Sequence, residues 1–205
     1  MKLLCFVGLS AGGLVCDLLN GTRTVITNEG VSNREHSVLK GVTPYLDKGK
    51  FNEILWGYKL KNYRSLYQTS EDVCLGTHTH PSCIPQKYLD IFSEIFVITC
   101  LTKESKIYLY LRYKHLYPNL PINPGAVCLD FPPINNCIAI EFSDIVNGKF
   151  VEEYNLDVEH FERWKAFNSF LYKELTQDEQ FEFENLMKRY KQETLYEYPT
   201  RTSTI

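Results

Sequence analysis

Two histidines separated by one residue are the side chains in this sequence best suited to chemistry near neutral pH. His78 and His80 lie in residues 76–85, directly after a short apolar run. Imidazole can take a proton from a hydroxyl because its ordinary pKa is about 6.5. Such a segment at the carboxyl end of a buried strand is where α/β proteins usually bind ligands. We therefore consider His78 as a general base and His80 as a residue that orients it or contacts substrate.

A glycine-rich segment near the amino terminus is the second candidate. Residues 8–13 read Gly-Leu-Ser-Ala-Gly-Gly and follow an apolar run at 3–7. A helical pattern comes next and ends at 20–21. A strand, a glycine-rich loop and a helix N-terminus can together bind a phosphate through backbone N–H groups. The full Walker pattern is absent, and the same glycines also suit an ordinary tight turn, so both interpretations stay open.

The composition indicates one folded domain in a reducing compartment. The chain has 205 residues, of which 44% are hydrophobic and 23% charged, and its net charge is −3. We therefore expect neither a nucleic acid nor a membrane as partner. The seven cysteines include no C-x-x-C pair, which favours buried, reduced thiols and a cytoplasmic location. Residues 1–9 resemble a signal peptide, but no A-x-A-like site follows, so we expect no cleavage there.

Strands alternate with helices along the chain, which predicts a three-layer α/β sandwich around a mostly parallel sheet. Apolar runs predict strands at 3–7, 24–27, 73–75, 94–99 and 137–140. Helical patterns are found at 14–19, 51–67, 86–92, 102–118, 158–172 and 177–191. Thr102 is expected to cap one helix, and Thr176 with Glu179 forms a capping box for the last. The remaining segments are expected to be loops at 28–50 and 117–136, a turn at 141–148, and an irregular tail at 194–205 after a single domain of residues 1–193.

The sequence around His78 resembles a motif of the sulfotransferases, the P-loop-like enzymes that use 3′-phosphoadenosine 5′-phosphosulfate. The cytosolic family carries K-T-H-L-P-x-S-x-L-P at a strand end, and residues 76–85 align with it without a gap. The positions that coincide are Thr77, His78, Ser82 and Pro85. Two further family patterns, P-K-S-G-T-T-W and V-V-Y-V-x-R-N-P-K-D, fall on residues 8–14 and 95–104. The similarity thus follows the chain in order, as a series of weak local matches.

The resemblance implies a P-loop NTPase-like sulfotransferase fold. It also implies transfer of a sulfuryl group from phosphoadenosine phosphosulfate to a hydroxyl of a small molecule or glycan. His78 falls on the family's catalytic histidine, whereas His80 falls where the family has a proline. By the same resemblance, the phosphosulfate would bind to the loop residues Ser10, Ala11, Gly12, Gly13 and Leu14.

Four polar or charged donor ligands of the family are missing from this chain. The matched positions hold Leu9, Gly76, Cys100 and Tyr108. Sulfuryl transfer builds negative charge, so the site needs cations or preorganised hydrogen-bond donors. The helix expected after residue 102 offers replacements, among which Lys106 is one candidate. To the donor site we assign Lys103, Ser105 and Arg112.

Two other interpretations stay open. Residues 78–81, His-Thr-His-Pro, also resemble the core of the JAMM zinc hydrolases. Zinc needs three protein ligands, and Asp90 is one residue short of the spacing in that motif, so we assign no metal ligand. The other alternative is a catalytically degenerate sulfotransferase-like protein that serves in binding or assembly, as the missing cations would indicate.

Overall fold

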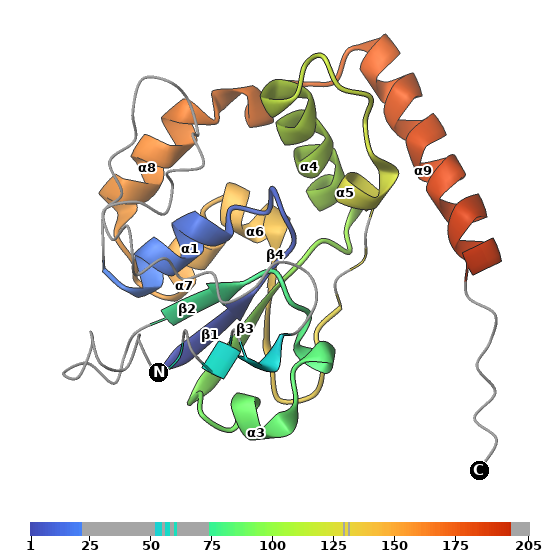
Figure 1. Cartoon of the computed structure of the whole chain (residues 1–205). Helices are drawn as coiled ribbons and strands as arrows, with labels where there is room; N and C mark the ends of the chain where they lie inside the picture. Colours follow the sequence, from blue (N-terminus) through green and yellow to red (C-terminus); the bar gives the residue numbers. More distant parts are fainter. Residues whose placement is uncertain are drawn as a thin grey trace.

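The centre of the molecule is a parallel β-sheet (Figure 1). The computed structural model describes residues 1–21, 52–54, 56–57, 60, 74–128, 130 and 132–197. Within them, four strands follow the order β2-β1-β3-β4, and every pair is parallel. The strands are β1 (Lys2–Cys5), β2 (Cys74–Thr77), β3 (Glu94–Thr99) and β4 (Ile138–Glu141). The predicted α/β class with a parallel sheet is confirmed, and the arrangement is compatible with a three-layer sandwich.

Strands β1, β2 and β3 carry buried apolar residues. Leu3, Leu4, Leu75, Phe96 and Ile98 are each at most 1% exposed. Parallel strands that are covered on both sides need such continuous apolar runs, and this explains why these runs were recognisable in the sequence. Burying one side chain of this size contributes about 1.5–3 kcal/mol to the free energy of unfolding.

The helices lie around the sheet and beyond its carboxyl edge. Their bounds are α1 (Gly12–Leu19), α3 (Gln86–Leu89), α4 (Lys103–Leu116), α5 (Pro124–Cys128), α6 (Phe142–Val146), α7 (Lys149–Glu153), α8 (Val158–Phe167) and α9 (Gln177–Glu197). Two 3₁₀ helices, η1 (Pro81–Cys83) and η2 (Ser169–Tyr172), complete the described elements. Helix α1 packs on β2 and α8, while α4 packs on α5, α6 and η2. Helix α9 packs on α5 and lies at the side of the molecule (Figure 1).

Two predicted helix caps are confirmed. The backbone N–H of Ser105 donates to Thr102 Oγ1 at 3.1 Å, at the start of α4. At the start of α9, the N–H of Glu179 donates to Thr176 Oγ1 at 3.3 Å, and the N–H of Thr176 donates to Glu179 Oε2 at 3.0 Å. Both caps join residues only three positions apart, so their side-chain types alone predict them.

Other predicted boundaries differ from the structure. The loop expected at 117–136 contains α5, and the turn expected from residue 141 is helix α6. The helix expected at 158–172 is divided, because Asn168 Nδ2 donates to the carbonyl of Trp164 at 2.9 Å where α8 ends. Helix α9 continues to Glu197, past the expected helix end at 191 and into the tail expected to be irregular from 194. Residues 24–27 and 28–50, and most of 51–67, lie outside the described part of the chain. No helix in the described part is both long and apolar enough to span a membrane.

Candidate functional site

The carboxyl ends of β1 and β2 bring together the two segments that the sequence singled out. Strand β1 lies between β2 and β3, so the chain leaves it toward one neighbour and later returns to the other. In open parallel sheets, ligands bind at such a switch point. The N–H of Phe6 donates to the carbonyl of Thr77 at 3.0 Å and holds the two strand ends together. We call residues 6–14 and 77–80 the edge site.

The loop from β1 to α1 has a strained backbone. Leu9 and Ala11 have φ angles of 74° and 58°, in a region that residues other than glycine rarely adopt. Ser10 between them is fully buried, and its Oγ donates to the carbonyl of Val7 at 2.7 Å. Its N–H also faces that carbonyl at 3.4 Å and is therefore used within the loop. Such strain is found mostly at functional sites, where the surrounding structure maintains it.

Packing requires a glycine at position 12 of this loop but not at position 8. A Cβ on Gly12 would lie 2.2 Å from the ring of Phe6, so that ring packs directly on the start of α1. A Cβ on Gly8 would meet no atom within 4 Å, and Gly8 is exposed. Gly12 therefore determines how closely α1 approaches the end of β1.

The first turn of α1 is buried but uncapped. Ala11 supplies no side-chain cap. The helix's first hydrogen bond runs from Val15 N–H to the Ala11 carbonyl at 3.1 Å. Within the described part of the chain, the N–H groups of Gly12, Gly13 and Leu14 donate to no acceptor, although all three residues are buried. Buried helix starts normally find partners for these groups. Their donors and the helix dipole favour an anion at this position.

His78 stands beside this helix start, directly after β2. Its Nδ1 lies 3.2 Å from the carbonyl of Phe6, and its ring packs on the Phe6 ring with centroids 4.6 Å apart. A carbonyl only accepts hydrogen bonds, so Nδ1 carries the proton and the lone pair is on Nε2. This is the tautomer that a general base acting through Nε2 requires.

Thr79 adds a second unsatisfied group to the edge site. The residue is fully buried, and its N–H donates to Thr77 Oγ1 at 3.1 Å. Its own Oγ1 has no hydrogen-bond partner in the part of the chain that the structure describes. A buried hydroxyl without a partner costs about 1–3 kcal/mol, so its persistence points to a missing ligand or water. Sequence analysis missed Phe6 and Thr79, and only their places beside predicted site residues could have indicated them.

His80 has a different environment from His78. Its Nδ1 accepts from Ser82 N–H at 3.2 Å and lies 2.6 Å from Ser82 Oγ, so it caps η1. Its Nε2 faces the carbonyl of Pro132 at 2.9 Å and must therefore carry the proton. Together, the bond from Nδ1 to η1 and the bond from Nε2 to Pro132 join η1 to the segment before β4. The zinc hypothesis gains no support, because among the described residues no three His, Cys, Asp or Glu side chains could hold a metal ion.

Three residues of α4 were predicted to bind the donor: Lys103, Ser105 and Arg112. Their contacts lie in different parts of the molecule. Ser105 is fully buried, and its Oγ accepts from Ser143 N–H at 2.8 Å, at the start of α6. Arg112 is 2% exposed, with its guanidinium 5.8 Å from the centre of the Trp164 ring on α8. Lys103 is exposed and lines a separate pocket. Among the contacts described above for these three residues, none is with the edge site.

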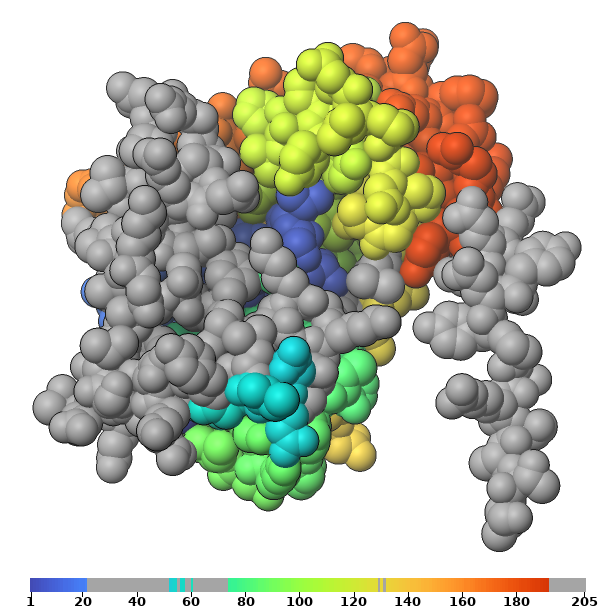
Figure 2. Space-filling view, in the orientation of Figure 1, coloured from blue at the N-terminus to red at the C-terminus, as the bar shows by residue number. Residues whose placement is uncertain are grey.

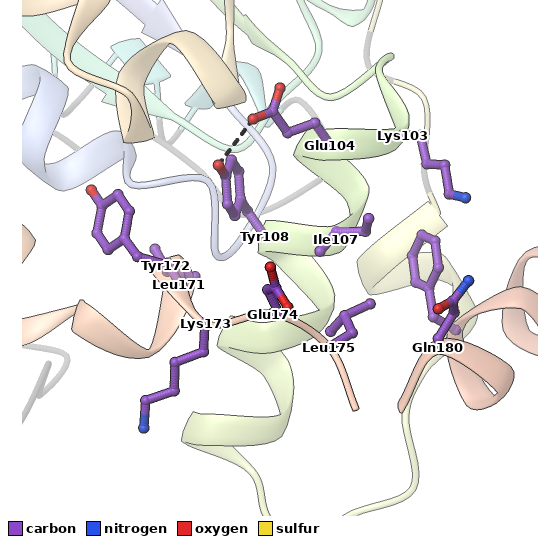
Figure 3. Close-up of a pocket in the computed structure, with 11 residues that line it drawn as sticks. Lys103, Glu104, Ile107, Tyr108, Leu171, Tyr172, Lys173, Glu174, Leu175 and Gln180 are labelled. Carbon is purple, nitrogen blue, oxygen red and sulfur yellow. Dashed lines mark hydrogen bonds between the residues drawn. The ribbon is translucent and has the colours of Figure 1, made fainter. Parts of the chain in front are cut away.

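That separate pocket has a volume of about 570 Å³ and lies between α4 and the link from η2 to α9 (Figure 3). Its hydroxyl groups already have partners: Tyr108 donates to Glu104 Oε1 at 3.0 Å, and Tyr172 donates to the carbonyl of Val146 at 2.7 Å. Burial raises the pKa of Tyr108 and of Tyr172 to about 12, so both phenols are neutral at physiological pH. The size of this pocket suits a small ligand. However, the hydroxyls of Tyr108 and Tyr172 already have hydrogen-bond partners, whereas Thr79 Oγ1 in the edge site has none among the described residues.

The chain matches no protein-family model and no curated protein. Its function must therefore be inferred from the site itself. The edge site combines buried donors that have no acceptor in the described part of the chain with an imidazole in a defined tautomer, at the point where open parallel sheets usually bind ligands.

Proposed function

We propose that the edge site binds the anionic end of a nucleotide donor and that His78 acts as general base in sulfuryl transfer. The donor would be 3′-phosphoadenosine 5′-phosphosulfate, and the acceptor a hydroxyl of a small molecule or glycan. The observation that carries this proposal is the buried, uncapped start of α1, where the amides of Gly12, Gly13 and Leu14 have no acceptor among the described residues. Phosphate or sulfate oxygens would satisfy these amides. The motif around His78 supports sulfuryl as the transferred group.

The chain's own residues can perform each step of this transfer. His78 Nε2 takes the acceptor's proton while the acceptor oxygen forms its bond to sulfur. The bond between sulfur and the bridging phosphate oxygen breaks, and 3′-phosphoadenosine 5′-phosphate leaves. The amides at the start of α1 donate to the oxygen that gains charge. The Phe6 carbonyl, 3.2 Å from His78 Nδ1, stabilises the imidazolium that forms.

Binding is tested by calorimetric titration of the full chain with 3′-phosphoadenosine 5′-phosphate. Gly8 provides a matched pair of variants, since a Cβ there meets no described atom within 4 Å. Gly8→Asp places a negative charge in the loop and is expected to raise the Kd at least about tenfold, whereas the neutral Gly8→Asn keeps the Kd within about twofold. Absence of binding at millimolar ligand, or an equal effect of both variants, would contradict the proposal.

Catalysis is tested with a sulfur-labelled donor and a panel of phenols and sugars as acceptors. We expect His78→Gln to lower the transfer rate by about 10²–10⁴ while the product nucleotide binds as before, because only the base is lost. His80→Ala should lower the rate less, in proportion to the loss of folded protein, because His80 caps η1 and bonds to Pro132. If His80→Ala were the more damaging change, the assignment of the base would be wrong.

Binding without catalysis is the second candidate function. It is favoured by the contacts of Ser105 and Arg112 with Ser143 and Trp164, which leave the predicted donor ligands engaged elsewhere. Nucleotide binding with no transfer to any acceptor in the panel would identify this function.

A further inference from the structure

Lys106 is a buried cation near the carboxyl end of β3. The residue is 8% exposed, and its Nζ lies 2.5 Å from Asp130 Oδ1. Its N–H donates to the carbonyl of Thr102, so it belongs to the first turn of α4. Lysine is rarely buried without a partner, because taking an ammonium group out of water is costly. The Asp130 side chain, in contrast, is 61% exposed.

Strand order places the start of α4 on the β3 side of the edge site. Strands β1 and β3 are parallel neighbours, with Cys5 paired to Val97, so the loop after β1 and the segment that leads from β3 into α4 leave the sheet at the same edge. Burial and the charge of Glu141 raise the pKa of the Cys100 thiol, while the Lys106 ammonium opposes this rise. The Lys106 ammonium thus lies near Cys100, the first residue after β3, at the edge of the sheet where the glycine-rich loop also begins.

We propose that Lys106 is the cation of the edge site, that Asp130 neutralises it when no ligand is bound, and that an anionic ligand replaces Asp130. This inference rests on the proposed function and identifies the charge that the loop itself lacks. Lysine binds phosphate as a point charge on a flexible stem, so it can exchange partners by rotating its side chain. Asp130 can leave at low cost because its carboxylate is already largely in water.

The other basic candidates on α4 are less suited to this role. Lys103 is exposed and lines the pocket toward α9. Arg112 lies six residues after Lys106, about 1.7 helical turns further along α4, and packs on Trp164. Lys106 alone among the three combines burial, a position in the first turn of α4 and an effect on the residue after β3.

The test is calorimetric titration of folded variants with 3′-phosphoadenosine 5′-phosphate. Lys106→Met keeps the apolar stem, and we expect it to raise the Kd at least about tenfold, while Lys106→Arg restores most of the affinity. Lys103→Met removes an exposed lysine from the same turn and should leave the Kd within about twofold. Asp130→Asn removes the competing carboxylate and should lower the Kd about three- to tenfold. The Lys106→Met/Asp130→Asn double variant should bind like Lys106→Met, because the two changes act on one pair.

Inorganic pyrophosphate as a second probe separates this inference from the proposed function. Binding of the nucleotide with an unchanged Kd in Lys106→Met would overturn the role of Lys106 and leave the proposed function standing. Binding of pyrophosphate alone, lost in Lys106→Met, would uphold Lys106 and reject the nucleotide donor. Weaker binding by Asp130→Asn would overturn the exchange of partners, and failure of both probes to bind would overturn both proposals.

Discussion

Phe6 connects the two halves of the edge site. Its ring packs on Gly12 at the start of α1 and on His78 after β2, and its carbonyl faces His78 Nδ1. One residue therefore sets both the approach of the helix and the tautomer of the imidazole. A change at Gly12 should reach His78 through this ring, although the two residues lie far apart in the sequence.

Alanine substitution at two glycines tests this packing. A methyl group at Gly12 would lie 2.2 Å from the Phe6 ring, so we expect Gly12→Ala to lower the free energy of unfolding by about 1–3 kcal/mol. Gly8→Ala has open space and no positive φ, and should leave stability unchanged or raise it by up to about 1 kcal/mol. Urea unfolding at neutral pH measures both values. Equal stabilities of the two variants would mean that Phe6 does not restrict the start of α1.

At the level of elements, Glu141 joins the end of β4 to the start of α4. Its carboxylate accepts from Thr99 Oγ1 at 2.5 Å and from both the N–H and the Oγ1 of Thr102 at 3.0 Å. Burial alone would raise the pKa of Glu141, but hydrogen bonds from Thr99, Ser105 and Thr102 outweigh it and lower the pKa. The loop after β3, and with it the helix that carries Lys106, is held by this carboxylate.

The depressed pKa predicts how stability depends on pH. Glu141 titrates below its ordinary value of 4.5 in the folded protein, so its contribution is complete above that pH and is lost as the pH falls through the folded pKa. We expect Glu141→Gln to be less stable than the natural chain at pH 7, with a difference that shrinks toward pH 3. Unfolding followed by circular dichroism across this range gives the comparison. A difference that stays constant with pH would show that the carboxylate charge is not the cause.

At the scale of the whole molecule, the cysteines report on the integrity of the core. All seven are free thiols. Those that are buried lie on β1, α1, β2 and α5 and just after β3, namely Cys5, Cys16, Cys74, Cys100 and Cys128. Burial raises the pKa of Cys5 and Cys100, which leaves little thiolate for reaction. Cys83 on η1 is exposed, and Cys137 is half-buried.

Alkylation of the buried cysteines by iodoacetamide should therefore follow global unfolding. We expect Cys83 to react first in the native protein, Cys137 more slowly, and the five buried thiols only at denaturant concentrations that unfold the chain. Peptide mapping by mass spectrometry identifies the modified positions. Rapid native modification of Cys16 or Cys74 would indicate that α1 opens locally from the sheet.

Local patterns in the sequence determined a large part of this fold. Apolar runs predicted all four described strands. The reason is clearest for β1 and β2, because strands buried on both faces of a parallel sheet must be continuously apolar. The caps at Thr102 and Thr176 were predictable because each joins residues three positions apart. Helix α6 was not predictable, because the side chain that bonds its first turn, Ser105, lies far away in the sequence. The division of the helix expected at 158–172 was also not predicted, and it depends on the bond from Asn168 to Trp164.

For the site, the sequence by itself determined the candidates, and the tertiary structure decided their environments. His78 and the glycine-rich loop were recognisable from residue types and spacing alone. The pairing of Lys106 with Asp130 and the bond from His80 to Pro132 were not. Nor was the finding that no described residue supplies an acceptor at the start of α1. The physical reason is sequence separation: capping and periodicity act within a few residues, whereas these contacts exist only after packing brings distant segments together.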